Sequence, residues 1–164
     1  LVQGAHNPIS LTGLHDNRRW HHHAVRVRRV AAAAAVQAAR QQPEPQQMLF
    51  VFARTELPEG ATAEEKQRFD KGQGGVMTPI MFVDKKPSEI ETFADLVEES
   101  RQMGEPWDFV FVGCLSGQGD REPSDEEVTK ALEVMVKSIQ GGIIDHLLTY
   151  RPDGEQVRLR GPQI

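Results

Sequence analysis

Cysteine is nearly absent from this sequence, since its 164 residues include only Cys114. One cysteine excludes an internal disulfide, a C-x-x-C redox pair and a structural zinc site built on paired thiolates. A chain without disulfides suits a reducing compartment, so we expect a cytoplasmic location. The sequence also has no apolar run approaching the ~20 residues that a membrane-spanning helix requires, and we therefore expect a soluble protein.

Acidic and basic residues are divided unevenly along the chain. The first 47 residues carry six arginines and two acids, a net charge of +4. The remaining 117 residues carry 13 bases and 22 acids, a net charge of −9. An acidic body repels polyphosphate backbones, so any nucleic-acid binding would have to come from the arginine-rich head.

The head itself has few features of a folded segment. Residues 1–29 show no sustained hydrophobic period and almost no acids, which is typical of a disordered or non-native N-terminal extension. The three adjacent histidines, residues 21–23, diverge on any regular backbone and lack acidic or thiol ligands nearby, so we predict no metal site. The arginine cluster of residues 18–29 has no aromatic stacking platform beyond Trp20, so we do not expect nucleic-acid binding.

The alanine-rich run that follows has high helix propensity but little bulk to bury. Pro43 and Pro45 end it because each removes a backbone donor. We therefore predict a short alanine-rich helix and a linker over residues 30–47.

Beyond this linker, apolar strands alternate with capped helices. Apolar runs at 48–53, 76–84 and 106–115 predict strands, the first central and the second at an edge because of Pro79. Three helices are predicted. One spans residues 62–71, a second begins at the capping pair Ser88 and Glu91, and a third begins at the capping pair Ser124 and Glu127. A turn at 152–154 predicts a terminal hairpin.

Together these elements predict the fold class. We expect one compact α/β domain over residues 48–164, with a mixed sheet of about five strands in βαβαβαββ order and helices packed on it. Crossovers between parallel strands of such a sheet should be right-handed.

Four segments carry a family resemblance: "ARQQPEPQQMLFVFARTELP", "FDKGQGGVMTPIMFVDKKP", "LVEESRQMGEPWDFVFVGCLSGQGDREP" and "MVKSIQGGIIDHLLTY". From about Ala38 to Val157 the chain resembles a family of small uncharacterised bacterial proteins, often labelled "ribonucleotide reductase subunit alpha". That label implies a barrel of several hundred residues with a radical cysteine and two further cysteine pairs. Cys114 alone cannot supply them, so we reject the label. The family supplies no catalytic residues to carry over.

The best candidate site is the loop from Ser116 to Arg121. It links a strand end to a helix start, where free N–H groups and positive potential favour an anion. We therefore take Ser116, Gly117, Gly119 and Arg121 as candidate ligand-binding residues. The loop lacks the lysine of a P-loop and the G-x-G-x-x-G pattern, and acids crowd the helix start. A turn followed by a helix cap is the simpler interpretation.

Other chemistry-bearing residues give weaker signals. Cys114 stands near a helix start but lacks a base, because His146 is the only histidine of the body and lies far along the chain. Asp84 and Asp120 could share a crevice, but their spacing is not specific for a metal. The glycines of residues 72–75 favour a helix stop and strand entry over a phosphate cradle. We predict no catalytic residues, no metal and no cofactor.

Two function classes remain from the sequence. The first is a non-catalytic interaction or regulatory module, in which an edge strand at Pro79 or at the hairpin pairs with a protein partner or a second copy. The alternative is a small-molecule or anion-binding, enzyme-like domain that uses the Ser116–Arg121 loop.

Overall fold

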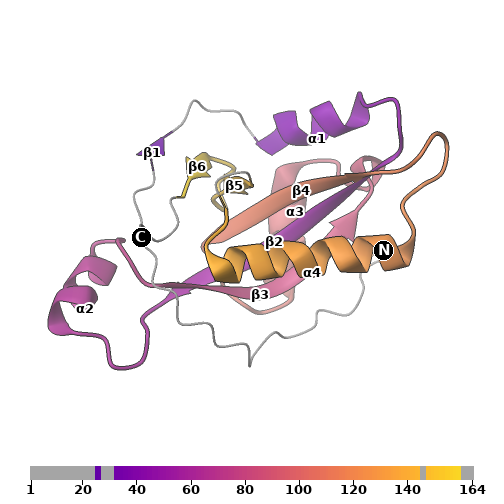
Figure 1. Cartoon of the computed structure of the whole chain (residues 1–164). Coiled ribbons are helices and arrows are strands. Elements are labelled where there is room, and N and C mark those ends of the chain that lie inside the picture. The colour runs from indigo at the N-terminus through magenta and orange to yellow at the C-terminus, as the bar shows by residue number, and fades with distance from the viewer. Residues whose placement is uncertain (1–24, 27–31, 145–146, 160–164) are drawn as a thin grey trace.

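A computed structural model describes residues 25–26, 32–144 and 147–159 of the chain. The predictions made for the three histidines, for Trp20 and for His146 fall on residues outside these ranges. Within them, a single sheet has helices on both of its faces (Figure 1).

The sheet has six strands in the order β1-β6-β5-β4-β2-β3, and every described strand pair is antiparallel. Strand β1 is only two residues long, and β2 is the longest. The strands are β1 (Val25–Arg26), β2 (Gln46–Glu56), β3 (Val76–Lys85), β4 (Phe109–Ser116), β5 (Leu148–Tyr150) and β6 (Gln156–Arg158).

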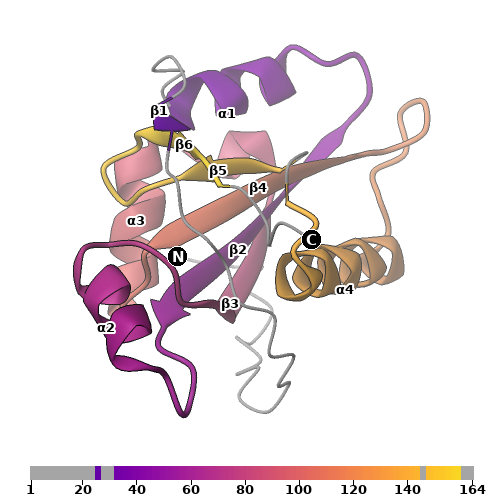
Figure 2. The same ribbon diagram turned by 60° about the vertical axis from the view of Figure 1, so that its left-hand side comes forward.

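In the described part of the chain, four α-helices and one short 3₁₀ helix connect the strands. They are α1 (Ala32–Arg40), α2 (Ala63–Asp70), η1 (Pro87–Glu89, the 3₁₀ turn), α3 (Phe93–Gln102) and α4 (Asp125–Gly141). Helix α4 covers one face of the sheet, α1 and α3 cover the other, and α2 projects from one end (Figure 2). None of the helices in the described ranges is long and apolar enough to cross a membrane.

From β2 onward the predicted βαβαβαββ order is confirmed. The predicted mixed sheet with neighbouring parallel strands is corrected, because all described neighbours are antiparallel. Helix α2 buries no residue and therefore does not act as a crossover packed on the sheet. After α2 the chain turns back, and β3 pairs directly with β2 in the antiparallel direction. Strands β3 and β4 run parallel to each other only across β2, which lies between them. The sheet therefore gains helices on both faces without adjacent parallel strands.

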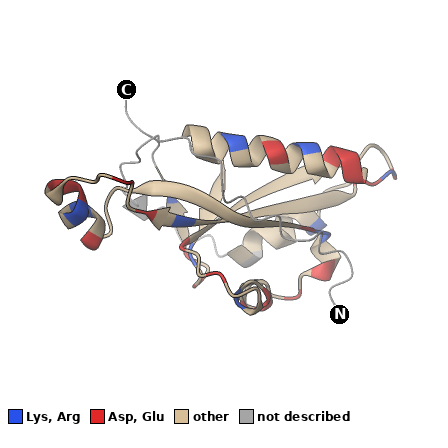
Figure 3. Ribbon diagram, turned by 90° about the horizontal axis from the view of Figure 1, so that it is seen from below, with Lys and Arg blue, Asp and Glu red and all other residues tan. Residues whose placement is uncertain are grey.

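The pleat of β2 explains the two-sided core. Leu49, Val51 and Ala53 belong to the apolar cluster beneath α4. Met48, Phe50 and Phe52 alternate with them and belong to the cluster beneath α1 and α3. Successive side chains of a strand point to opposite faces, so a strand buried on both faces must be apolar at every position. The strand that the sequence predicted to be central lies inside the sheet, between β4 and the edge strand β3. Figure 3 shows that charged residues lie on the helices and at the strand ends, which agrees with an apolar centre of the sheet.

Strand β3 changes face at a bulge. Its register against β2 shifts between the partners of Phe52 and Ala53, so that Ile80 is the extra residue. As a result Met77 lies in the α4 cluster and Met81 in the opposite cluster. Pro79 stands directly beside the bulge, where a missing backbone donor disrupts the ladder least.

The alanine-rich segment is tied to the rest of the molecule. Helix α1 buries Ala32, Val36 and Ala39 in the cluster that also contains Phe50. At its end the Arg40 guanidinium donates to the backbone carbonyl oxygens of Pro87 and Ile90. Strand β2 then begins at Gln46, two residues before the predicted start.

At one place the head joins the sheet. The two residues of β1, Val25 and Arg26, pair with Arg158 and Val157 of β6, where the sequence predicted an extension outside the fold. The rest of that prediction, for residues 1–24 and 27–29, lies outside the described residues. The predicted terminal hairpin is confirmed, with Gly154 at φ +84° in the turn between β5 and β6.

The helix starts follow side-chain caps, with one correction. Ser124 and Glu127 form the predicted capping box of α4, and Gly142 at φ +84° ends that helix. The helix predicted from Ser88 begins instead at Phe93, where the Thr92 hydroxyl accepts the N–H of Asp95 at 3.1 Å. Residues 87–89 form a separate 3₁₀ turn with its own hydrogen bonds, so the predicted capping pair of Ser88 and Glu91 does not begin an α-helix.

Candidate functional site

The loop after β4 is folded back on itself. Gln118 and Arg121 exchange two backbone hydrogen bonds, at 3.0 and 2.9 Å, and the Gly117 N–H donates to the Pro45 carbonyl at 2.8 Å. The Ser116 hydroxyl accepts a bond of 2.8 Å from the Gln46 amide. The four predicted residues of this loop therefore lie close together. Polar groups of Ser116, Gly117 and Arg121 already form hydrogen bonds within the protein.

Both predicted glycines of the loop have a structural reason. A Cβ atom at Gly117 would lie 1.9 Å from the backbone oxygen of Arg121, so only glycine allows this close approach. Gly119 adopts φ +58°, a left-handed conformation that disfavours other residues. Glycine is therefore required here by the turn, whether or not the loop binds a ligand.

Arg121 forms an ion pair with Glu127 at the start of α4. The Arg121 guanidinium lies 3.1 Å from Glu127 Oε1. Hydrogen bonds from the Ser124 hydroxyl and backbone, with a smaller contribution from Arg121, lower the pKa of Glu127. An anion approaching this helix start would meet the ionised Glu127. The prediction that the loop holds a ligand stays a prediction.

Cys114 has little nucleophilic character in this setting. It lies on β4 opposite Met48 and reaches solvent. Desolvation by surrounding protein atoms nevertheless raises the pKa of its thiol. A raised pKa keeps sulfur protonated at neutral pH, whereas an activated cysteine needs the thiolate.

The remaining predicted positions have structural roles. The Asp84 carboxylate accepts a 2.8 Å bond from the Gln47 amide. In the described part of the chain, no three His, Cys, Asp or Glu side chains gather as a metal site would require. The glycines of residues 72–75 stand between α2 and β3 and include three at positive φ, so the predicted helix stop and strand entry is confirmed.

Strand β3 forms one edge of the sheet, as the sequence predicted from Pro79. At the opposite side of the described sheet the edge strand is β1 and not the hairpin, because β1 pairs with the outer side of β6. No described strand pairs with the outer side of β3.

Alternation along β2 indicates which groups of β3 face outward. The Ala53 oxygen accepts from Asp108, and the Thr55 N–H donates to the Asp108 carboxylate, so both residues face β4. In an antiparallel ladder the donor and acceptor of one residue point the same way, and neighbouring residues alternate. Residues 48, 50 and 52 of β2 therefore face β3, and the backbone groups of Phe82 and Asp84 point away from β2.

A pocket of about 200 Å³ opens beside this edge, between β3 and α3. Its walls are mainly apolar and include Phe52, Val83, Leu96 and Met103. The indole of Trp107 packs edge-on against Phe52 with ring centroids 5.0 Å apart, and its N–H donates to the buried Ser100 hydroxyl of α3 at 2.7 Å. These contacts fix the floor of the pocket and hold α3 over the sheet.

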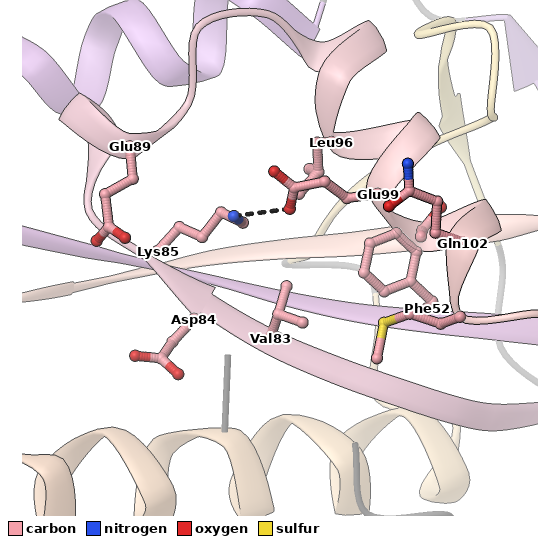
Figure 4. A pocket seen from close by; sticks show the side chains of 10 residues that line it. Phe52, Val83, Asp84, Lys85, Glu89, Leu96, Glu99 and Gln102 are labelled. Carbon is pink, nitrogen blue, oxygen red and sulfur yellow. Dashed lines mark ion pairs between the residues drawn. The ribbon is translucent and has the colours of Figure 1, made fainter. Parts of the chain in front are cut away.

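An ion pair crosses the pocket from strand to helix (Figure 4). Lys85 Nζ lies 2.8 Å from Glu99 Oε2, and the exposed fractions of the two side chains are 9% and 39%. An ammonium has three donors and a carboxylate about four acceptor positions. Among the described residues Glu99 is the only partner of the Lys85 side chain. Both groups therefore retain capacity for a further polar partner.

Sequence reasoning missed this pair because the predicted strand of residues 76–84 ends one residue before Lys85, whereas β3 includes it. The signal was present, since Met81, Val83 and Lys85 share the period of two that marks one face of a strand. Figure 4 shows the Asp84 side chain directed toward α4, away from Lys85 and Glu99. The side chains of Asp84, which the sequence did not favour as a metal ligand, and of Lys85 thus point to opposite faces of β3.

Comparison with known proteins adds no further guide. No protein-family model, curated protein or solved structure gives a significant match to this chain.

Proposed function

We propose that this protein is a non-catalytic interaction module that binds an extended segment of another protein along the edge of β3. Added strands gain affinity from main-chain hydrogen bonds and specificity from pockets that accept alternate side chains. The observation that carries the proposal is the outward direction of the backbone groups of Phe82 and Asp84. No other described residue bonds to them.

The usable part of the edge is short. Pro79 lacks a donor, and the bulge at Ile80 interrupts the ladder on the N-terminal side. Both features protect sheet edges against unselective pairing. The proposed contact is therefore confined to residues 82–85, next to the pocket beneath α3.

We favour a different protein over a second copy as the partner. Two-fold pairing of β3 with itself would bring the pocket rims of two copies together, and each rim carries Glu89 and Glu99. Like charges brought together across an interface oppose association. The acidic charge of the body, −9 over residues 48–164, acts in the same direction.

We propose a non-catalytic function because the candidate reactive groups, Cys114 and Arg121, lack the surroundings that catalysis would require. The Cys114 thiol has a raised pKa, and Arg121 faces Glu127 across the loop. Neither arrangement resembles an activated nucleophile or a preorganised anion site.

A display selection of random heptapeptides on the full chain would test the proposal. We expect selected peptides rich in β-branched residues, and we expect binding to slow amide hydrogen exchange at Phe82 and Asp84. Phe82→Pro removes one outward donor and should weaken the selected peptides at least about tenfold, as the loss of a hydrogen bond in a desolvated interface does. Phe82→Ala is the matched control, because it also removes the ring but keeps the N–H.

Two results would contradict the proposal. Selected peptides that leave exchange at Phe82 and Asp84 unchanged would place binding elsewhere. A concentration-dependent dimer in sedimentation experiments, dissociated by Phe82→Pro and not by Phe82→Ala, would identify a second copy as the partner.

A further inference from the structure

We propose that the pocket between β3 and α3 selects a basic side chain, preferentially arginine, from the segment that pairs with β3. This inference rests on the proposed function and names the chemistry of the partner. It is carried by the position, size and charge of the pocket.

The position follows from strand geometry. Val83 and Lys85 point to the α3 face of β3, since Val83 belongs to the cluster beneath α3 and Lys85 pairs with Glu99 of that helix. Residues directly opposite each other on neighbouring strands project to the same face, with Cβ atoms ~5 Å apart. A residue of the added strand opposite Val83 or Lys85 would therefore direct its side chain into the pocket.

The size suits one side chain. Sites for small-molecule ligands usually enclose ~300–1,000 Å³, whereas this pocket encloses about 200 Å³. Its apolar walls, formed by Val83, Leu96 and Met103, would pack against a long aliphatic stem. Lysine and arginine bury such stems along apolar surface and keep the charged end in a polar setting.

The charge at the α3 side of the pocket favours a cation. Two carboxylates on this side, those of Glu89 and Glu99, line the pocket together with one ammonium, that of Lys85. Glu99 pairs with the ammonium, and the Glu89 carboxylate accepts the Lys86 N–H. Glu99 is engaged by Lys85 through Oε2, and its side chain remains 39% exposed. An acidic side chain would meet two like charges, and an apolar one would desolvate Glu99 without adding a donor.

Arginine fits this arrangement better than lysine. Its planar guanidinium presents several donors in a fixed fork, so it can share the Glu99 carboxylate with Lys85 while its stem lies on Leu96. Lysine adds a compact ammonium close to that of Lys85. We therefore expect arginine to be selected first and lysine second.

The heptapeptide selection described above tests this inference on the full chain. We expect arginine to be enriched at one position, flanked by β-branched residues. Replacing that arginine with leucine in a selected peptide should raise its Kd at least tenfold. Glu99→Gln should weaken the arginine peptide by a similar factor and leave the leucine peptide within about threefold, which is the signature of direct coupling.

Glu98→Gln provides the matched control. It removes the same charge from the same helix, and Glu98 faces solvent beside Arg101 instead of lining the pocket. Peptide affinity should stay unchanged in this variant. If Glu99→Gln alone does not fold, the double variant Lys85→Met with Glu99→Gln removes the whole ion pair and should show the same loss of preference for arginine.

The outcomes separate this inference from the proposed function. Peptides that need the Phe82 N–H but show no basic preference, or whose arginine is insensitive to both Glu99 variants, would overturn the inference and leave strand pairing intact. Peptides that bind independently of the Phe82 N–H would overturn both.

Discussion

The loop after β4 and the pocket beside β3 lie at two strand ends and use polar groups in opposite ways. In the loop, the Ser116 hydroxyl, the Gly117 N–H and the Arg121 guanidinium all have partners within the protein. In the pocket, the Lys85 side chain is almost fully buried and has one partner among the described residues, and Glu99 is partly open to solvent.

This difference separates a closed turn from the surface that we propose as a binding site. A glycine-bearing loop next to a helix start carries the sequence signal for an anion site, but its geometry closes the turn and caps the helix. The pocket carries no recognised motif. Its half-buried ion pair and the outward backbone of β3 nevertheless leave hydrogen-bonding groups that the proposed partner would use.

The largest effect that we expect comes from filling the close contact in the loop. Gly117→Ala would place a methyl group 1.9 Å from the Arg121 oxygen, so the backbone must move. We predict a loss of about 3 kcal/mol in the free energy of unfolding, measured in urea. Gly119→Ala is the control, because its Cβ meets nothing within 4 Å and only the left-handed φ should cost about 1 kcal/mol. Equal losses from the two changes would argue against a steric role for Gly117.

The next effect concerns the ion pair in the pocket. Glu99→Gln leaves the buried Lys85 ammonium opposite a neutral amide. Because Glu99 is 39% exposed, solvent moderates the loss, and we predict a decrease of about 1 kcal/mol in the free energy of unfolding. Glu98→Gln should change stability much less, since its contact with Arg101 is 3.9 Å long and exposed. Equal stability of the two variants would show that the pair is not structurally important.

A smaller effect distinguishes the two regions as ligand sites. If the loop bound phosphate at a hundred times its Kd, stability would rise by ~2.7 kcal/mol, or roughly 5–10 °C in melting temperature. We predict a rise of less than about 1 °C with phosphate or nucleotides, because Glu127 already occupies the position facing Arg121. A larger rise that disappears in Arg121→Ala would instead support the anion-binding alternative.

The smallest effect is a change in titration at the start of α4. The Ser124 hydroxyl lowers the pKa of Glu127, so this carboxylate stabilises the fold above its unfolded pKa and loses that contribution as pH falls through the folded pKa. Carboxyl-carbon NMR should find the Glu127 midpoint below that of an ordinary glutamate. Ser124→Ala should raise this midpoint, and Arg121→Ala should raise it less. The reverse ranking would assign the shift to the ion pair.

The sequence predicted the element order and the buried central strand because these depend on local patterns. Apolar residues at every position of 48–53 can be satisfied only between two layers, and Ser124 with Glu127 caps a helix through contacts three residues apart. The antiparallel pairing was missed because α2 has the propensity of a helix, and propensity does not reveal whether a helix packs on a sheet.

What the sequence alone determined about this protein is therefore where its strands and helices lie, which strand is buried on both faces, and that glycines are needed in the turns. Only the tertiary structure decided which backbone groups of the β3 edge point outward, and that Lys85 meets Glu99 beneath α3. The physical reason is distance along the chain: periodicity and capping act over a few residues, whereas strand order and ion pairing between elements depend on how the whole sheet buries its apolar surface.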